Sequence, residues 1–229
     1  MSEERLPPLH QPKQLIRVEY QERLDGVDDE LVGAALVIAE AFPRITRSFL
    51  AGDRGCVEDA HSMAADVDER CRRVEDEGFL LLAREAPVSG DLRRLVAILR
   101  LVWAVERSAA LLRHVAETTE RFDARLLPLP VRQQVEELAV RAAEVFRQGV
   151  DAWRLRDGLA VTELDRRDAQ VDVIAQGLMT RSEQQVDSPA DLLMLGLLAR
   201  YFERIADHGV AFAQHGTFAV TGERSPVRR

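Results

Sequence analysis

The chain lacks several features that mark whole classes of protein. Its 229 residues contain no apolar run near the ~20 residues of a membrane span, and the polar first twelve residues hold no signal-peptide core. Cys56 and Cys71 fall on one predicted helix, about 22 Å apart, which is too far for a disulfide. We therefore expect a cytoplasmic protein. No phosphate loop, nucleophile elbow or Cys-x-x-Cys motif is present, so the sequence predicts no conventional enzyme.

The chain also has fewer basic than acidic residues. The chain has 31 lysine and arginine residues against 39 aspartate and glutamate residues, which gives a net charge of −8. Nucleic-acid binding needs a basic patch, so this balance argues against nucleic acid as the main partner. An acidic surface instead suits cations or a basic protein surface.

What is present is the composition of a helical protein. Aromatic residues make up only 5% of the chain, whereas alanine, leucine, valine, arginine and glutamate dominate. Apolar residues recur every three or four positions, and no period-two pattern competes. This spacing predicts six helices, at about 13–50, 54–86, from Ser89 or Asp91 onward, 131–155, 162–186 and 188–216. Trp103 and Trp153 fall on apolar faces, so we expect both in the core.

Two segments about 100 residues apart resemble each other. Asp91-Leu92 is followed by Glu106-Arg107, and Asp191-Leu192 is followed by Glu203-Arg204. Such repetition predicts two similar halves. We expect an all-α, elongated fold of two tandem, pseudo-symmetric three-helix bundles. The predicted division is a disordered N-terminus (1–12), a first repeat (13–125), a linker (126–130), a second repeat (131–221) and a disordered tail (222–229).

Pairs of carboxylates form the main candidate site. Glu203 and Asp207 are four residues apart on one predicted helix, and Asp168 and Asp172 on another, so each pair shares a helix face. Two such helices facing each other can form an oxygen-rich cage for Mg, Mn or Fe, or for Zn with help from His208. Chance alone produces several such pairs in a chain this acidic, so a solvated face stays open as the alternative.

With these motifs the sequence resembles the PhoU family over about residues 17–223. In that family the first half carries a Pro-Val-Ala-x-Asp-Leu-Arg segment, which residues 87–93 match. Residues 203–208 match a Glu-Arg-Ile-Gly-Asp-His-like segment, and 168–172 match an Asp-x-x-x-Asp element. Four further residues of these motifs are expected to serve partner binding or structure: Pro87, Asp91, Arg93 and Arg204.

The resemblance implies a fold and a role. Members are two similar three-helix bundles, with metal clusters associated with the acidic motif of each half. Their role is negative regulation of phosphate-starvation signalling, as an adaptor between the ATPase subunit of the phosphate ABC transporter and a sensor histidine kinase. The resemblance thus implies a protein that is peripheral to the membrane through its partners only. A homodimer stays open.

The first half departs from the family pattern. Ala64 and Ala110 stand where the family has acids, which leaves Asp68 and Glu106 as a remnant. We therefore expect the first-half site to bind metal weakly or not at all, while the second-half site of Asp168, Asp172, Glu203 and Asp207 could hold a divalent or iron- or zinc-type ion. Two alternatives remain: a metal-storage or di-metal bundle, and a helical scaffold without metal.

Overall fold

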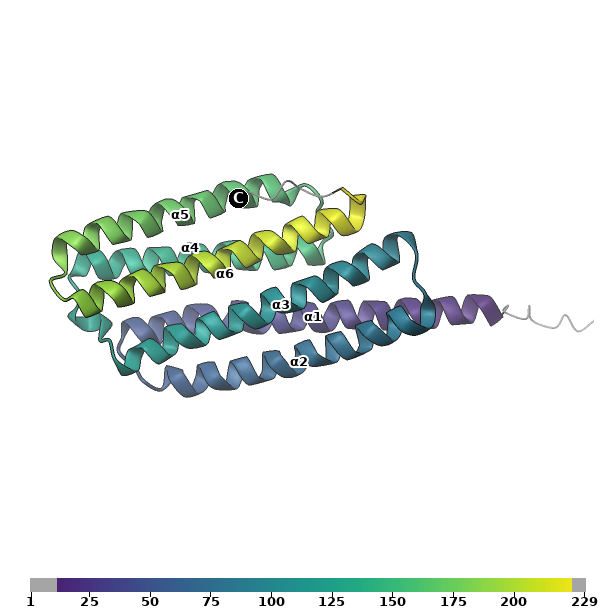
Figure 1. Ribbon diagram of the computed structural model, residues 1–229, viewed down its shortest axis with the longest axis horizontal. Coiled ribbons are helices and arrows are strands. Elements are labelled where there is room, and N and C mark those ends of the chain that lie inside the picture. The colour runs from purple at the N-terminus through teal and green to yellow at the C-terminus, as the bar shows by residue number, and fades with distance from the viewer. Residues whose placement is uncertain (1–11, 224–229) are drawn as a thin grey trace, which may run out of the picture.

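Every regular element within residues 12–223, the part of the chain that the computed structural model describes, is a helix (Figure 1). The six long helices are α1 (Pro12–Leu50), α2 (Cys56–Glu85), α3 (Ser89–Glu117), α4 (Leu129–Arg154), α5 (Ala160–Gln185) and α6 (Pro189–Thr221). Two short 3₁₀ turns, η1 (Thr118–Glu120) and η2 (Ala124–Leu126), connect α3 to α4. The predicted all-α fold of two three-helix bundles is confirmed.

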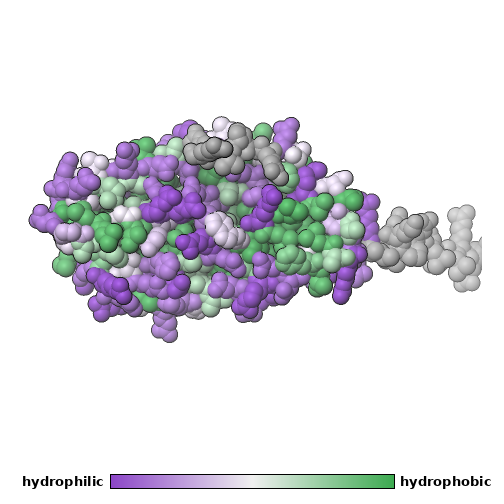
Figure 2. All heavy atoms as spheres, viewed as in Figure 1, coloured by the Kyte–Doolittle hydropathy of each residue, from purple (hydrophilic) through white to green (hydrophobic). Residues whose placement is uncertain are grey.

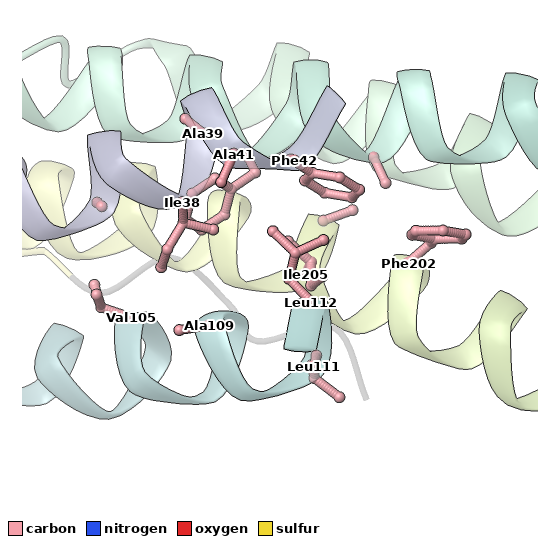
Figure 3. Packing of buried hydrophobic residues seen from close by; sticks show 14 of the residues in the cluster. Ile38, Ala39, Ala41, Phe42, Val105, Ala109, Leu111, Leu112, Phe202 and Ile205 are labelled. Carbon is pink, nitrogen blue, oxygen red and sulfur yellow. The ribbon is translucent and has the colours of Figure 1, made fainter. Parts of the chain in front are cut away.

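The two bundles lie side by side with their long axes roughly parallel (Figure 1). Helices α1–α3 form one bundle and α4–α6 the other, and the bundles meet where α1 packs on α4 and α3 packs on α6. The ring of Phe42 in α1 stacks on that of Phe202 in α6, with centroids 5.7 Å apart, and Ile205 and Leu112 lie beside this pair (Figure 3). The bundles therefore share one hydrophobic core.

Glycine permits the closest contact between helices. A Cβ atom on Gly209 of α6 would lie 2.5 Å from the Cα atom of Phe146 and 2.6 Å from the carbonyl oxygen of Val145, both in α4. Gly149 of α4 faces Gly209 and has equally little room. Because the obstructing atoms belong to the backbone, a side chain at either position would force α4 and α6 apart.

The ends of the helices differ from the predictions in part. Ser188 caps α6 as expected, since its hydroxyl accepts a hydrogen bond from the Asp191 N–H (3.3 Å). Helix α3 was expected to begin at Ser89 or Asp91 with one of them as its cap. The N-cap residue is instead Val88, which makes no capping hydrogen bond through its side chain. Helix α6 also continues past its predicted end at residue 216 and stops at Gly222, whose φ of 81° suits glycine.

The predicted disordered segments fall mostly outside the described part of the chain. Residues 1–11 and 224–229 are not described, whereas residue 12 begins α1 and residue 222 ends α6. The repeat and linker bounds given above stay predictions. None of the helices within residues 12–223 is both long enough and apolar enough to cross a membrane.

Candidate functional site

The second-half acids lie on two helices that pack against each other. Asp168 and Asp172 are one turn apart on α5, and Glu203 and Asp207 are one turn apart on α6. Partial burial, with a further contribution from the Asp172 carboxylate, raises the pKa of both Glu203 and Asp207 above their usual values. The structure thus brings Asp172, Glu203 and Asp207 within electrostatic range of one another.

Arginines already neutralise part of this acidic face. An Nη1 atom of Arg200 lies 3.4 Å from Glu203, and that of Arg204 lies 3.2 Å from Asp207. Within residues 12–223, no three histidine, cysteine, aspartate or glutamate side chains are placed to hold a metal ion together. As arranged, the second-half carboxylates do not fit a metal cage. The metal centre stays a prediction.

His208 turns away from the acids, although it was predicted as their auxiliary ligand. Its ring is buried, and Nδ1 lies 2.8 Å from the Ser108 hydroxyl of α3. That hydroxyl donates its proton to the Ala104 carbonyl, so Nδ1 of His208 must be the donor and Nε2 carries the lone pair. Nε2 is buried without a hydrogen-bond partner in the described chain, and burial lowers the pKa of His208 to about 4.

The first-half acids gain a member that the sequence reasoning missed. Partial burial and the carboxylates of Glu75 and Asp68 on α2 raise the pKa of Glu106 on α3. Cys71 lies on the same stretch of α2, and burial, together with these acids, raises its pKa to about 12. Glu75 follows Asp68 by two helical turns, so their shared face of α2 was the available signal.

The Asp-Leu-Arg motif ties helices together at one end of the molecule. Pro87 lies in the connection between α2 and α3, and Asp91, in the first turn of α3, accepts a hydrogen bond from Gln21 of α1 (3.0 Å). Arg93 lies two residues further into α3 and is partly buried. The structural role predicted for Asp91 therefore has a visible basis, because it links α3 to α1.

The two tryptophans have different environments. Trp153 is buried as expected, and its indole N–H donates to Asp28 across the bundle interface (2.6 Å). Trp103 is 56% exposed, so the prediction that it lies in the core was wrong. Its ring meets the His208 ring of α6 edge-on, with centroids 5.4 Å apart, so the exposed indole lies where α3 and α6 pack together.

The sequence of the chain is similar to those of known PhoU proteins. Residues 33–119 match the PhoU domain. Over 210 residues the chain is 29% identical to the phosphate-specific transport system accessory protein PhoU homolog 1 of Mycobacterium leprae, with 90% of this chain and 95% of that protein covered. It is 28% identical to PhoU homolog 2 of Mycobacterium tuberculosis, over 90% of this chain and 99% of that protein.

The chain is thus similar to PhoU proteins along nearly its whole length. Two solved structures share its fold. The crystal structure of PhoU from Pseudomonas aeruginosa superposes with a TM-score of 0.82 at 18% identity and covers 89% of this chain and all of that one. The phosphate transport system regulatory protein PhoU from Streptococcus pneumoniae gives 0.81 at 16% identity, over 91% of this chain and all of that one.

The PhoU match is distributed unevenly over the chain. The matched domain spans the second half of α1 together with α2 and α3, which is the bundle with the depleted acidic site. The second bundle carries the fuller acidic motif and aligns with PhoU proteins through the full-length relatives and the two superposed structures. The features shared across both bundles are thus the helical architecture and the paired motifs.

Proposed function

We propose that this protein is a member of the PhoU family and an accessory regulator of phosphate transport that represses phosphate-starvation signalling. The observation that carries the proposal is the similarity, along nearly the whole chain, to proteins named as phosphate-specific transport system accessory proteins. The finer proposal is an adaptor in the cytoplasm. It docks on the ATPase subunit of the phosphate ABC transporter and on a sensor histidine kinase.

The shape and rigidity of the molecule support an adaptor. The two bundles share one core, so surfaces on the first bundle keep a fixed position relative to those on the second. One side of the molecule is mainly hydrophilic and carries separate apolar patches toward its two ends (Figure 2). Two partners could therefore be held at a defined spacing. This role requires no catalysis by the chain itself.

The exposed Trp103 is the docking residue that we favour on α3. An exposed tryptophan is unusual in a monomeric surface and common at the centre of protein interfaces. Glu106 lies one turn further along α3, and Asp207 precedes His208, the residue against which Trp103 packs. A partner surface that combines an apolar pocket with arginine or lysine side chains would complement this arrangement.

The regulatory step follows from docking. When phosphate is plentiful, the adaptor holds the kinase in the state that removes phosphate from its response regulator. Loss of contact with either partner releases the kinase to signal starvation. The mechanism works by a shift in the kinase conformational equilibrium and needs only that the adaptor bind one kinase state more tightly than the other.

A deletion experiment tests the proposal. The gene is removed, and an alkaline phosphatase reporter is measured in phosphate-rich medium. We expect the reporter to switch on, and to switch off again when the wild-type gene is restored. A reporter that stays silent in the deletion strain contradicts the negative-regulator role.

Complementation variants test the docking residue. Trp103→Ala is expected to restore repression poorly while the protein remains folded, because the indole is more than half exposed. Leu159→Ala provides a matched control, since this apolar side chain is also exposed but lies in the connection between α4 and α5. Full repression by Trp103→Ala would remove that residue from the interface but would leave the adaptor role standing.

A further inference from the structure

A cavity of about 570 Å³ lies where the two bundles meet at one end of the molecule. It is lined by the first half of α1, the first turns of α3, the end of α4 and the last turns of α6. In Figure 1 this is the end at which α3 begins and α6 finishes. Three aspartates and three arginines are the charged lining residues: Asp25, Asp28, Asp91, Arg93, Arg94 and Arg156. The volume suits a small organic ligand.

The carboxylates in this cavity already have partners. Arg94 donates to Asp28 through Nε (2.9 Å) and to Asp25 through Nη1 (2.6 Å). Asp28 also accepts the hydrogen bond from the indole of Trp153, and Asp91 accepts the one from the Gln21 amide. Each of these carboxylates therefore already accepts a hydrogen bond, and of the three arginines only Arg94 donates to them.

The other two arginines are spare donors. Within residues 12–223, Arg93 and Arg156 form no ion pair and no side-chain hydrogen bond. The Nε atom of Arg93 is inaccessible to solvent and has no acceptor. Both arginine side chains line the cavity, so an anion that entered it could accept charge-assisted hydrogen bonds from guanidinium groups that have no other acceptor in the described part of the chain.

The backbone at Arg156 is a second, independent observation. Arg156 has a φ of 54°, in the left-handed region that glycine usually occupies at the end of a helix. Its N–H donates to the Trp153 carbonyl, and the next N–H donates to the Ala152 carbonyl, which is the usual way to end a helix there. Arginine is less stable than glycine in this conformation, yet it places a guanidinium at the cavity.

We propose that this cavity binds an oxyanion of the phosphate type through Arg93 and Arg156. Planar guanidinium groups suit phosphoryl oxygens because they can donate two parallel hydrogen bonds. The ligand is either free phosphate or the phosphoryl group of a small molecule, for which the cavity has room. Because Arg93 belongs to α3 and Arg156 follows α4, the bound anion connects the two bundles. The inference stands apart from the proposed role in transport.

Binding can be followed from inside the cavity. The chain has two tryptophans, so Trp103→Phe leaves Trp153, which lines the cavity, as the only indole reporter. This protein is titrated with inorganic phosphate and, separately, with AMP, and calorimetry on the wild-type protein repeats both titrations. We expect saturable binding of at least one of the two. Tighter binding of phosphate assigns the site to the free ion, and tighter binding of AMP assigns it to a phosphorylated small molecule.

Three variants separate binding from folding. Arg93→Gln should weaken the binding about ten-fold or more. Arg156→Gly should weaken it similarly while the protein is at least as stable as wild type, since glycine accepts the left-handed backbone. Arg84→Gln, which removes an exposed arginine outside the cavity, should bind as wild type. The proposal is overturned if neither ligand binds by calorimetry into the millimolar range, or if Arg93→Gln and Arg156→Gly bind as tightly as wild type.

Discussion

Replacing His208 with leucine is expected to make the protein more resistant to acid. In the native state the imidazole is buried between α3 and α6 and stays neutral, because burial lowers its pKa from 6.5 to about 4. The positive charges of Arg204 and Arg107 act in the same direction. The unfolded chain binds a proton near pH 6.5, whereas the folded chain does not. Stability is therefore lost as the pH falls from about 6.5 to about 4.

The size of the effect follows from the shift in pKa. A lowering from 6.5 to about 4 corresponds to about 3 kcal/mol of stability that is present above pH 6.5 and absent below pH 4. Leucine has no proton to bind, and it also removes the unpartnered Nε2 atom. The corresponding position of the first bundle, Leu111, is already leucine and is buried. We therefore expect His208→Leu to be near neutral at pH 7 and stabilising by about 3 kcal/mol, relative to wild type, near pH 4.

Urea denaturation followed by circular dichroism measures this difference. The unfolding free energies of wild type and His208→Leu are compared at several pH values between about 4 and about 7. His61→Gln serves as the control, since it also removes a histidine but one whose ring is half exposed on α2 rather than buried. If wild type and His208→Leu lose stability in parallel on acidification, the buried neutral imidazole is not what couples this fold to pH, and the reasoning is wrong.

Three further predictions concern packing and charge. Gly209→Ala should destabilise the protein by about 2 kcal/mol or more in the same assay, because the added Cβ would collide with the backbone of α4. Gly26→Ala is the control: a Cβ there would have nothing within 4 Å, so alanine should stabilise α1 by up to about 1 kcal/mol. The unfolding free energy of Glu203→Gln should rise relative to that of wild type as the pH rises from about 4 to 7. The pKa of Glu203 is raised in the folded protein, so ionisation of this carboxyl disfavours the fold. A difference in unfolding free energy that does not change with pH would contradict this. Equilibrium dialysis against Mn²⁺ or Zn²⁺ should find at most one site per chain, and two full sites would refute the loss predicted for the first bundle.

Most of the fold could be predicted because helical periodicity and proline placement are local signals. The break at Pro128 and Pro130 and the start of α6 at Ser188 and Pro189 are encoded by the residues that form them. The end of α6 was missed because Gly216 looked like a stop. In the structure Gly216 is buried in the helix and lies close to Trp153, a contact made by tertiary packing.

The candidate site could be predicted only within each helix. The four-residue spacing of Glu203 and Asp207 fixed their common face, and that of Asp168 and Asp172 fixed theirs, but that the two faces would meet was only a hypothesis. What the sequence could not give was the register between the bundles. The exposure of Trp103 and the cavity shared by Arg93 and Arg156 depend on how α3 and α4 meet the neighbouring bundle, which no local pattern encodes.

A single stretch of α6 links these features. Within two turns it directs Glu203 and Asp207 toward α5, His208 toward Ser108 of α3, and Gly209 against the backbone of α4. Because successive residues of one helix point in different directions, a shift of α6 that loosened one contact would disturb the other two. Because the Trp103 ring packs on the His208 ring, a partner docked at Trp103 would act on this stretch of α6 through that contact. Binding of a partner at Trp103 should thus affect three features together: the acidic face, the imidazole of His208 and the contact between α4 and α6. We expect to detect it as altered hydrogen exchange of the α6 amides on either side of Gly209.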